Sequence, residues 1–285
     1  MMVLAAVLAL TLQTGPAALE RTEDGRLSVD VKIEGRGPWP FIVDTGASHT
    51  AIAEPLAVEF GFTPGGDLSE VQTLTEQIRS ERVTLEQVSA AGVTVGFLEA
   101  VVVAAPSDLE LRIFGLLGAD VFAGRIVRLD GANARLDTNA PRPAFEDARL
   151  HEQRNVPVAR ATLSRLSDSV PVMIDTGSAR TIVNTALQRR LRAASPGLRY
   201  SVGSATRLAR EEDAEAVRLR GLRAGGLCAR NIVAVAADVD VFRALGWANR
   251  PAMIMGMDAL HDAVLTIDHR TGAVEISPAD GARCG

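Results

Sequence analysis

The sequence has one lysine, no basic run and no basic half. Lys32 is the only lysine, so arginine supplies the remaining positive charge, and the formal net charge is −5. Proteins that bind nucleic acid normally carry a basic patch or stripe. We therefore expect no nucleic-acid partner, and we attribute the arginine bias to genome composition.

Long apolar runs are also missing. Residues 3–12 form an apolar run of ten residues, which is too short to cross a bilayer but suits a secretory signal. Small residues follow at Gly15, Ala17 and Ala18, although no basic segment precedes the run. We expect residues 1–18 to be a signal peptide, with a buried strand as the alternative. A signal peptide predicts a periplasmic or secreted protein with no membrane contact beyond that segment.

Cysteine and histidine are sparse and scattered. Cys228 and Cys284 are the only cysteines, and they fit either one disulfide in an exported protein or two unpaired thiols. Two distant cysteines without a histidine cluster lack the number of ligands that a metal site needs. We expect no metal and no organic cofactor. The histidines lie far apart in the sequence, at His49, His151, His261 and His269.

An internal repeat is present. Residues 40–52 read PFIVDTGASHTAI, and residues 171–183 read PVMIDTGSARTIV. Further along, residues 116–121 read LLGADV and residues 254–259 read IMGMDA. Each of these later segments is followed by a run typical of a strand that ends in aspartate. Duplicated segments in the same order indicate two homologous halves.

The repeat predicts an all-β fold of two lobes. We expect an N-terminal lobe at residues 19–139, a linker at 140–155 and a C-terminal lobe at 156–285. The linker contains two prolines, many charges and no alternation of apolar and polar residues. Apolar and β-branched runs predict strands at 29–33, 40–43, 83–88, 100–104, 217–222 and 231–236. Helices are expected only at 51–60 and 179–194, with a helical turn after Gly118 and after Gly256.

The repeated Asp-Thr-Gly motif has the residue types that water-mediated peptide hydrolysis needs. Attack by water requires one group that accepts a proton and another that donates one. Two carboxylates at hydrogen-bond distance cannot both ionise cheaply, so they share one proton and supply both roles. A duplicated lobe brings Asp44 and Asp175 together across a pseudo-twofold axis.

The residues beside each aspartate have supporting roles in this interpretation. The hydroxyl groups of Thr45 and Thr176 can hydrogen-bond across the axis to the opposite loop. Gly46 and Gly177 allow a tight turn and offer a backbone N–H to the carboxylate. A rigid apolar strand precedes each motif.

On these motifs, the sequence resembles aspartic peptidases of the pepsin and retropepsin type, over most of residues 27–277. The resemblance implies two β-barrel lobes, a cleft between them and a water held by Asp44 and Asp175. It implies an endopeptidase that takes a peptide or protein substrate. One chain carries both aspartates, so a monomer suffices for the reaction. The alternative is a module on the same fold that binds a peptide or protein without cutting it.

The sequence departs from the pepsin pattern beside the aspartates. Pepsins usually carry a hydroxyl after each glycine that hydrogen-bonds the adjacent aspartate. Here Ser178 can do so, whereas Ala47 cannot. Loss of a donor raises the pKa of a carboxylate, so we expect a less acidic optimum than that of pepsin.

Two further expectations concern the surroundings of the cleft. The flap is expected within residues 65–79, with a counterpart within 200–212, although the only tyrosine, Tyr200, lies in the second lobe. Asp120 and Asp258 follow the later glycines, and we expect each to cap a short helix.

Overall fold

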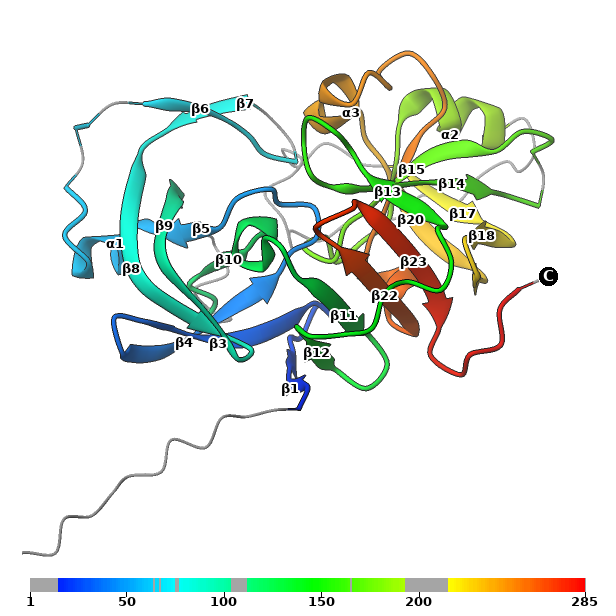
Figure 1. The fold of residues 1–285 in the computed structure, drawn as a ribbon. Coiled ribbons are helices and arrows are strands. Elements are labelled where there is room, and N and C mark those ends of the chain that lie inside the picture. The colour runs from blue at the N-terminus through cyan, green and yellow to red at the C-terminus, as the bar shows by residue number, and fades with distance from the viewer. Residues whose placement is uncertain are drawn as a thin grey trace, which may run out of the picture.

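The structure, a computed structural model, describes residues 15–63, 65–66, 68–74, 77–103, 112–164, 166–192 and 215–284. It is mostly strand with a few short helices, arranged in two lobes (Figure 1). This confirms the all-β, two-lobed fold. The apolar run at 3–12 and the expected second flap at 200–212 lie outside the described residues.

In the described part of the N-terminal half lie strands β1 to β12, helix α1 and the 3-10 helix η2. In chain order these elements are β1 (Ala17–Ala18), β2 (Glu20–Arg21), β3 (Leu27–Ile33), β4 (Arg36–Val43), β5 (Ala51–Ala53), α1 (Glu54–Glu59), β6 (Ser69–Gln72), β7 (Gln77–Ser80), β8 (Arg82–Ala90), β9 (Val93–Val103), β10 (Gly115–Leu117), η2 (Ala119–Phe122), β11 (Ile126–Asp130) and β12 (Arg135–Asp137).

Among the described residues of the C-terminal half are strands β13 to β23 and helices α2, α3 and α4. Its elements are β13 (Ala148–Leu150), β14 (Pro157–Thr162), β15 (Val170–Ile174), β16 (Ile182–Val183), α2 (Thr185–Arg192), β17 (Ala216–Leu219), β18 (Leu222–Ala224), β19 (Leu227–Ala229), β20 (Ile232–Ala236), α3 (Asp240–Ala244), β21 (Met253–Met255), α4 (Met257–Leu260), β22 (Ala263–Asp268) and β23 (Ala273–Pro278).

The first lobe is a sheet that closes on itself. Its seven strands run in the order β2-β3-β4-β10-β5-β9-β8, and β8 also pairs with β3. In β3, Val29, Val31 and Ile33 are buried while Asp30 and Lys32 are exposed. Alternate residues of a strand point to opposite faces, so this pattern fills the lobe interior and solvates its outside.

Both halves contain the same crossing of strands. In the first half β4 pairs in parallel with β10, which pairs antiparallel with β5; in the second, β15, β21 and β16 repeat this arrangement. All five residues of β15 are buried, as expected for a strand covered on both faces. The crossing therefore holds the ends of β4 and β15, which carry the two Asp-Thr-Gly motifs.

Helices α1 and α2 begin later than the sequence predicts. The segments expected to start helices instead form β5 and β16, because they complete the two strand crossings. Tertiary pairing therefore overrides the helical pattern at 51–53 and 182–183. The helical turns expected after Gly118 and Gly256 are present as η2 and α4.

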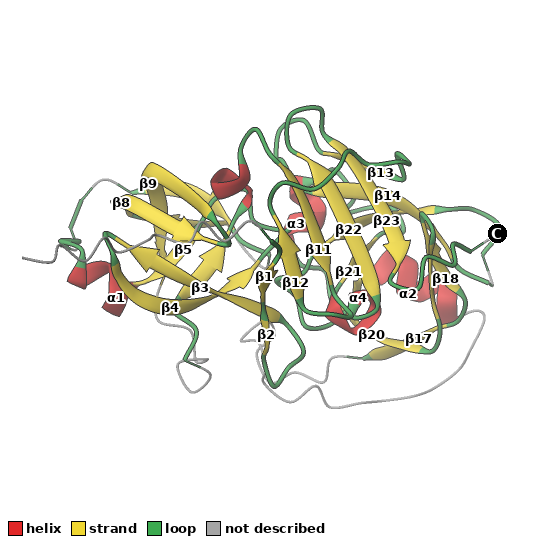
Figure 2. Ribbon diagram, turned by 60° about the horizontal axis from the view of Figure 1, so that its bottom comes forward, coloured by secondary structure: helices red, strands yellow, loops and turns green. Residues whose placement is uncertain are grey.

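One sheet joins the two halves. Strand β11 pairs antiparallel with β22, so the order β12-β11-β22-β23 combines strands from both repeats (Figure 2). The expected linker at 140–155 also belongs to this sheet in part, since β13 pairs with β14 and β23. Its pairing partners stabilise this short segment as a strand although its sequence does not alternate.

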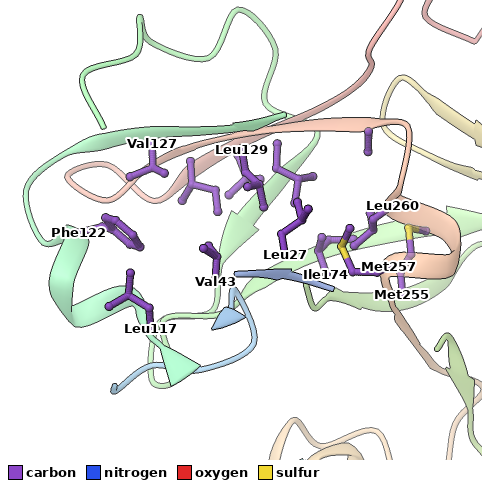
Figure 3. Close-up of a cluster of buried hydrophobic side chains, with 14 of the residues drawn as sticks. Leu27, Val43, Leu117, Phe122, Val127, Leu129, Ile174, Met255, Met257 and Leu260 are labelled. Carbon is purple, nitrogen blue, oxygen red and sulfur yellow. The ribbon is translucent and has the colours of Figure 1, made fainter. Parts of the chain in front are cut away.

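The core is continuous between the lobes. Apolar side chains from both repeats belong to one buried cluster, including Val43 and Phe122 from the first and Ile174 and Met255 from the second (Figure 3). Burial of apolar surface is the main favourable contribution to folding. The lobes therefore share the interior beneath the Asp-Thr-Gly loops.

Cys228 and Cys284 form a disulfide, with their Cα atoms 6.0 Å apart. Of the two alternatives that the sequence leaves open, the structure has the bonded one. The bond fastens the C-terminal tail to β19. Within the described residues, no helix is both long enough and apolar enough to cross a membrane.

Candidate active site

Asp44 and Asp175 follow directly on the two crossing strands. The backbone N–H of Asp44 donates to the carbonyl of Leu117 at 3.1 Å, and that of Asp175 donates to Met255 at 3.0 Å. Each loop is therefore fixed where it leaves its strand. The equivalent bonds in the two halves make the loops a related pair.

The two threonines hydrogen-bond across the axis, as the sequence predicts. The Thr45 hydroxyl donates to the Ile174 carbonyl at 2.9 Å, and the Thr176 hydroxyl donates to Val43 at 2.6 Å. Each hydroxyl also accepts the backbone N–H of the other threonine at 3.1 Å. Four bonds across the axis hold the two loops in one arrangement.

The two glycines contact the opposite aspartates. Gly46 N–H donates to its own Asp44 at 2.8 Å, and Gly177 N–H donates to Asp175 at 2.9 Å. A Cβ atom on Gly46 would lie 2.6 Å from an Asp175 oxygen, and one on Gly177 would lie 2.3 Å from the Asp44 carboxyl carbon. Only glycine permits this approach, which the sequence analysis missed.

The two carboxyl groups perturb each other. Burial, followed by the charge of Asp44, raises the pKa of Asp175 well above its ordinary value. Burial also raises the pKa of Asp44, while its hydrogen bond with Asp175, the Gly46 N–H and the charge of Arg26 oppose this shift. Asp44 and Asp175, called the aspartate pair below, therefore titrate as one unit.

The expected role of the Ser178 hydroxyl is wrong. This hydroxyl donates to the carbonyl of Arg180 at 2.8 Å, and the backbone N–H of Ser178 donates to Asp175 instead, at 3.2 Å. A nearby carbonyl in the same turn satisfies the hydroxyl. The expected increase in the Asp44 pKa is present, but its main cause is burial rather than the missing hydroxyl at Ala47.

Contrary to expectation, neither Asp120 nor Asp258 is the N-cap residue of its helix, although Asp120 accepts the Val121 N–H within η2 at 3.0 Å. The residues at the start of η2 and α4 are Gly118 and Gly256, and neither position has a side-chain cap. Asp120 instead accepts bonds from the N–H and hydroxyl of Thr50, at 2.8 and 2.7 Å. Asp258 accepts the corresponding pair from Thr181 at 2.9 and 2.7 Å. These carboxylates tie the far ends of the Asp-Thr-Gly loops to the strand crossings.

A hairpin extends from the first lobe to the second. Strand β6 lies within the segment expected to contain the flap, β7 ends one residue beyond it, and the hairpin that they form reaches toward α3 (Figure 1). The Val241 N–H donates to the Leu74 carbonyl at 3.2 Å. The Leu74 side chain packs on the buried cluster around Phe242 and Trp247. The hairpin is therefore held by both lobes.

The described residues contain no group of three or more histidine, cysteine, aspartate or glutamate side chains that could hold a metal ion. Among curated proteins, none matches the chain. A family model described as aspartyl protease matches residues 29–121 and 162–259. The two matches contain Asp44 and Asp175, respectively, and together span more than half of the sequence. This chain belongs to the aspartyl protease family.

Proposed function

We propose that this protein is an aspartic endopeptidase whose aspartate pair activates water to hydrolyse peptide bonds. The observation that carries the proposal is the approach of the Asp44 and Asp175 carboxyls across two glycines that no other residue type can replace. Membership of the aspartyl protease family supports a protease in general. The endopeptidase mechanism is our inference from the pair.

The reaction needs one proton shared between the two carboxyls. The charged carboxylate accepts a proton from water, whose oxygen attacks the peptide carbonyl carbon. The neutral carboxyl donates its proton to the carbonyl oxygen, which gives a tetrahedral diol. The protonated carboxyl then gives its proton to the amide nitrogen while the other carboxylate takes a proton from a diol hydroxyl, so that the C–N bond breaks and an acid and an amine are released. The pair ends with one proton, as it began.

The surroundings favour different roles for the two aspartates. Asp44 receives the favourable charge of Arg26 and the Gly46 N–H, which stabilise its ionised form. Asp175 is 4% exposed, and burial favours its neutral form. We assign the shared proton of the free enzyme to Asp175, which makes Asp44 the base toward water.

The test is cleavage of a mixed peptide library between about pH 3 and pH 7. The native protein is compared with Asp44→Asn and Asp175→Asn, with and without pepstatin. Cleavage by the native protein, and loss in each variant with its fold retained, is the expected result. If the peptides stay intact in all three samples, the proposed peptidase activity is rejected, and the alternative of a module that binds peptides without cutting them remains. An optimum near pH 2 would contradict the raised pKa values of the pair.

A further inference from the structure

A second concave site lies beside the aspartate pair. It is a pocket of about 420 Å³, within the usual range for small-ligand sites. Four segments line it: the end of β2 with the turn that leads to β3, the turn between β11 and β12, the loop after Asp175, and α4 with the two residues that follow it. We call it the arginine pocket, after Arg21 and Arg180.

The arginine pocket adjoins the aspartate pair on two sides. Arg180 lies in the Asp175 loop, and its carbonyl accepts the Ser178 hydroxyl at 2.8 Å. Gly25, another lining residue, directly precedes Arg26, whose charge is close enough to Asp44 to lower its pKa. A peptide extending from the pair in this direction would therefore meet the pocket.

Most acidic groups around the pocket already have partners. Asp24 accepts the guanidinium of Arg26 at 2.8 Å and the hydroxyl of Thr22 at 2.6 Å. Asp262 lies 2.9 Å from the ring nitrogen of His261. The charge of Asp24 is therefore offset by Arg26, and Asp262 has a hydrogen-bonding partner in His261.

A third acidic group, Asp258, uses one oxygen to bind Thr181, and burial raises its pKa. Its other oxygen is buried without a partner among the residues that the structure describes. A raised pKa favours the neutral form as the pH falls toward the acidic range. Asp258 therefore cancels less positive charge under the acidic conditions in which an aspartate pair works.

The two arginines retain free hydrogen-bonding capacity. Arg21 donates to the carbonyls of Gly131, at 2.5 Å, and Gly25, at 3.3 Å, and to no carboxylate in the described part of the chain. The Arg180 side chain is exposed and forms no hydrogen bond or close ion pair with those same residues, although its charge is near enough to Asp258 to oppose the rise in the pKa of that carboxyl. A guanidinium presents five N–H donors in a planar fork that matches a carboxylate.

Building on the proposed peptidase function, we propose that the arginine pocket is a substrate subsite for a carboxylate group, bound by Arg180 and Arg21. The group is an acidic side chain or the terminal carboxylate of a peptide. Both sources offer the same two oxygens to the guanidinium groups. The pocket would then select where along a substrate the aspartate pair cuts.

The first test measures binding without cleavage. Matched pools of fluorescent peptides carry Glu or Gln at one position, or end in a free acid or an amide, and are titrated against Asp175→Asn by anisotropy. We expect about tenfold tighter binding of one acidic pool, because a hydrogen bond between a guanidinium and a carboxylate is stronger than one between neutral groups. The position of the preferred Glu, or a preference for the free acid, identifies the source. Equal binding of every matched pair overturns the proposal.

Variants in the same Asp175→Asn background assign the preference to residues. Arg180→Gln should abolish the preference for acidic peptides. Arg180→Glu should reverse it, so that peptides with Lys at the same position bind more tightly. Arg142→Ala, which removes an exposed arginine outside the pocket, should keep it. Arg21→Gln should weaken it. A preference unchanged in both Arg180 variants and in Arg21→Gln overturns the assignment.

Cleavage of the same pools by the native protein separates the two proposals. Preferred binding of an acidic pool without any cleavage would reject the peptidase and keep the carboxylate site. Cleavage that is equal for acidic and amide pools, with equal binding, would reject the site and keep the peptidase. The expected result is a kcat/KM about tenfold higher for the acidic pool, lost in Arg180→Gln.

Discussion

At the scale of single residues, the glycines of the two motifs act across the axis as well as within their own turns. Each donates an N–H to the aspartate of its own loop and leaves space for the carboxyl of the other. The two carboxyls can approach each other only because both glycines lack a Cβ atom. Gly46 and Gly177 therefore determine how closely the two carboxyl groups approach, although neither glycine takes part in the reaction.

Substitution of Gly177 by alanine tests this contact. The new Cβ would lie 2.3 Å from the Asp44 carboxyl carbon, so Asp44 must move. We expect kcat to fall about 100-fold or more, as for other displacements of about 1 Å at a reacting group. Peptide cleavage and a thermal unfolding curve are the measurements.

Gly96→Ala is the matched control for this substitution. No atom lies within 4 Å of a Cβ at Gly96, so activity should stay at the native level. Full activity of a folded Gly177→Ala protein would show that the approach across the glycines does not matter for the reaction.

The raised pKa of Asp175 predicts an effect on stability. Its folded-state pKa lies above the ordinary value that it has in the unfolded chain. Between these values the folded protein binds more protons, so the free energy of unfolding falls as pH rises through that window. Asparagine cannot ionise, so Asp175→Asn should raise the melting temperature at pH 7 by roughly 2 °C or more.

Melting curves at pH 4 and pH 7 check the sign of this effect. The gain of Asp175→Asn over the native protein should be larger at pH 7 than at pH 4. Asp30→Asn removes an exposed carboxylate from β3 and should show no such difference. An Asp175→Asn protein that is less stable than the native one at pH 7 would contradict the raised pKa.

The candidate site was predictable from sequence only where its chemistry is local. Asp44, Asp175 and the threonines stand in a repeated motif, so their approach followed from the duplication. The hydroxyl of Ser178 and the carboxylates of Asp120 and Asp258 were assigned to wrong partners. Their actual partners depend on how the strand crossing folds back on the loops, which a linear sequence does not specify.

At the scale of elements, the strand crossings of the two lobes are tied by equivalent carboxylates that are used differently. Asp120 uses both oxygens, since one accepts the Thr50 N–H and the other accepts its hydroxyl. Asp258 uses a single oxygen for both donors of Thr181. The hydrogen bonds to Thr50 in the first lobe therefore require both carboxylate oxygens of Asp120. Those to Thr181 in the second lobe require only one oxygen of Asp258.

This difference predicts unequal effects of two matched substitutions. Asp120→Asn places an NH₂ group against a donor, which should lower the free energy of unfolding by about 1–3 kcal/mol. Asp258→Asn keeps the oxygen that binds Thr181 and should cost about 0.5 kcal/mol or less. Urea unfolding measures both. Equal losses would show that the two tethers work alike.

The hairpin of β6 and β7 is expected to depend on Leu74 for its contact with α3. Leu74→Ala removes the side chain that packs on the Phe242 cluster while leaving its carbonyl in place. We expect exchange of the Val241 amide hydrogen to accelerate about tenfold, because the contact opens more often.

Gln77→Ala is the control for the hairpin, because Gln77 is exposed on β7 and bonds only Glu70 among the described residues. Val241 exchange should be unchanged in that variant. Native exchange of Val241 in Leu74→Ala would mean that the side chain does not hold the hairpin.

Most elements were predictable, but their pairing across the halves was not. Apolar alternation identified β3 and β8, and strand-like runs ending in aspartate identified β11 and β22, because both signals are local properties of the sequence. The joint sheet of β11 and β22 pairs residues more than a hundred positions apart. The sequence of neither strand specifies the strand with which it pairs. The strand β13 was missed for the same reason, since its partners rather than its sequence make it a strand.

At the scale of the molecule, the two lobes are joined by a common sheet and a common core. They share a sheet through β11 and β22 and a continuous buried cluster beneath the loops. The N-terminal segment adds a further link, because β1 pairs with β12 in the joint sheet and β2 pairs with β3 in the first lobe. The aspartate pair thus lies where the lobes are most firmly connected.

The C-terminal tail closes the molecule through the bond between Cys228 and Cys284, which are 56 positions apart. The tail is also held by Arg283, which donates to Asp147 at 2.6 Å. Replacing both cysteines by serine should lower the free energy of unfolding by about 2–4 kcal/mol, because the bond restricts the unfolded chain. A reductant should destabilise the native protein by the same amount and leave the serine variant unchanged. If the reductant breaks the bond without moving the urea midpoint of the native protein, Arg283 and the strands of the second lobe hold the tail without help from the disulfide.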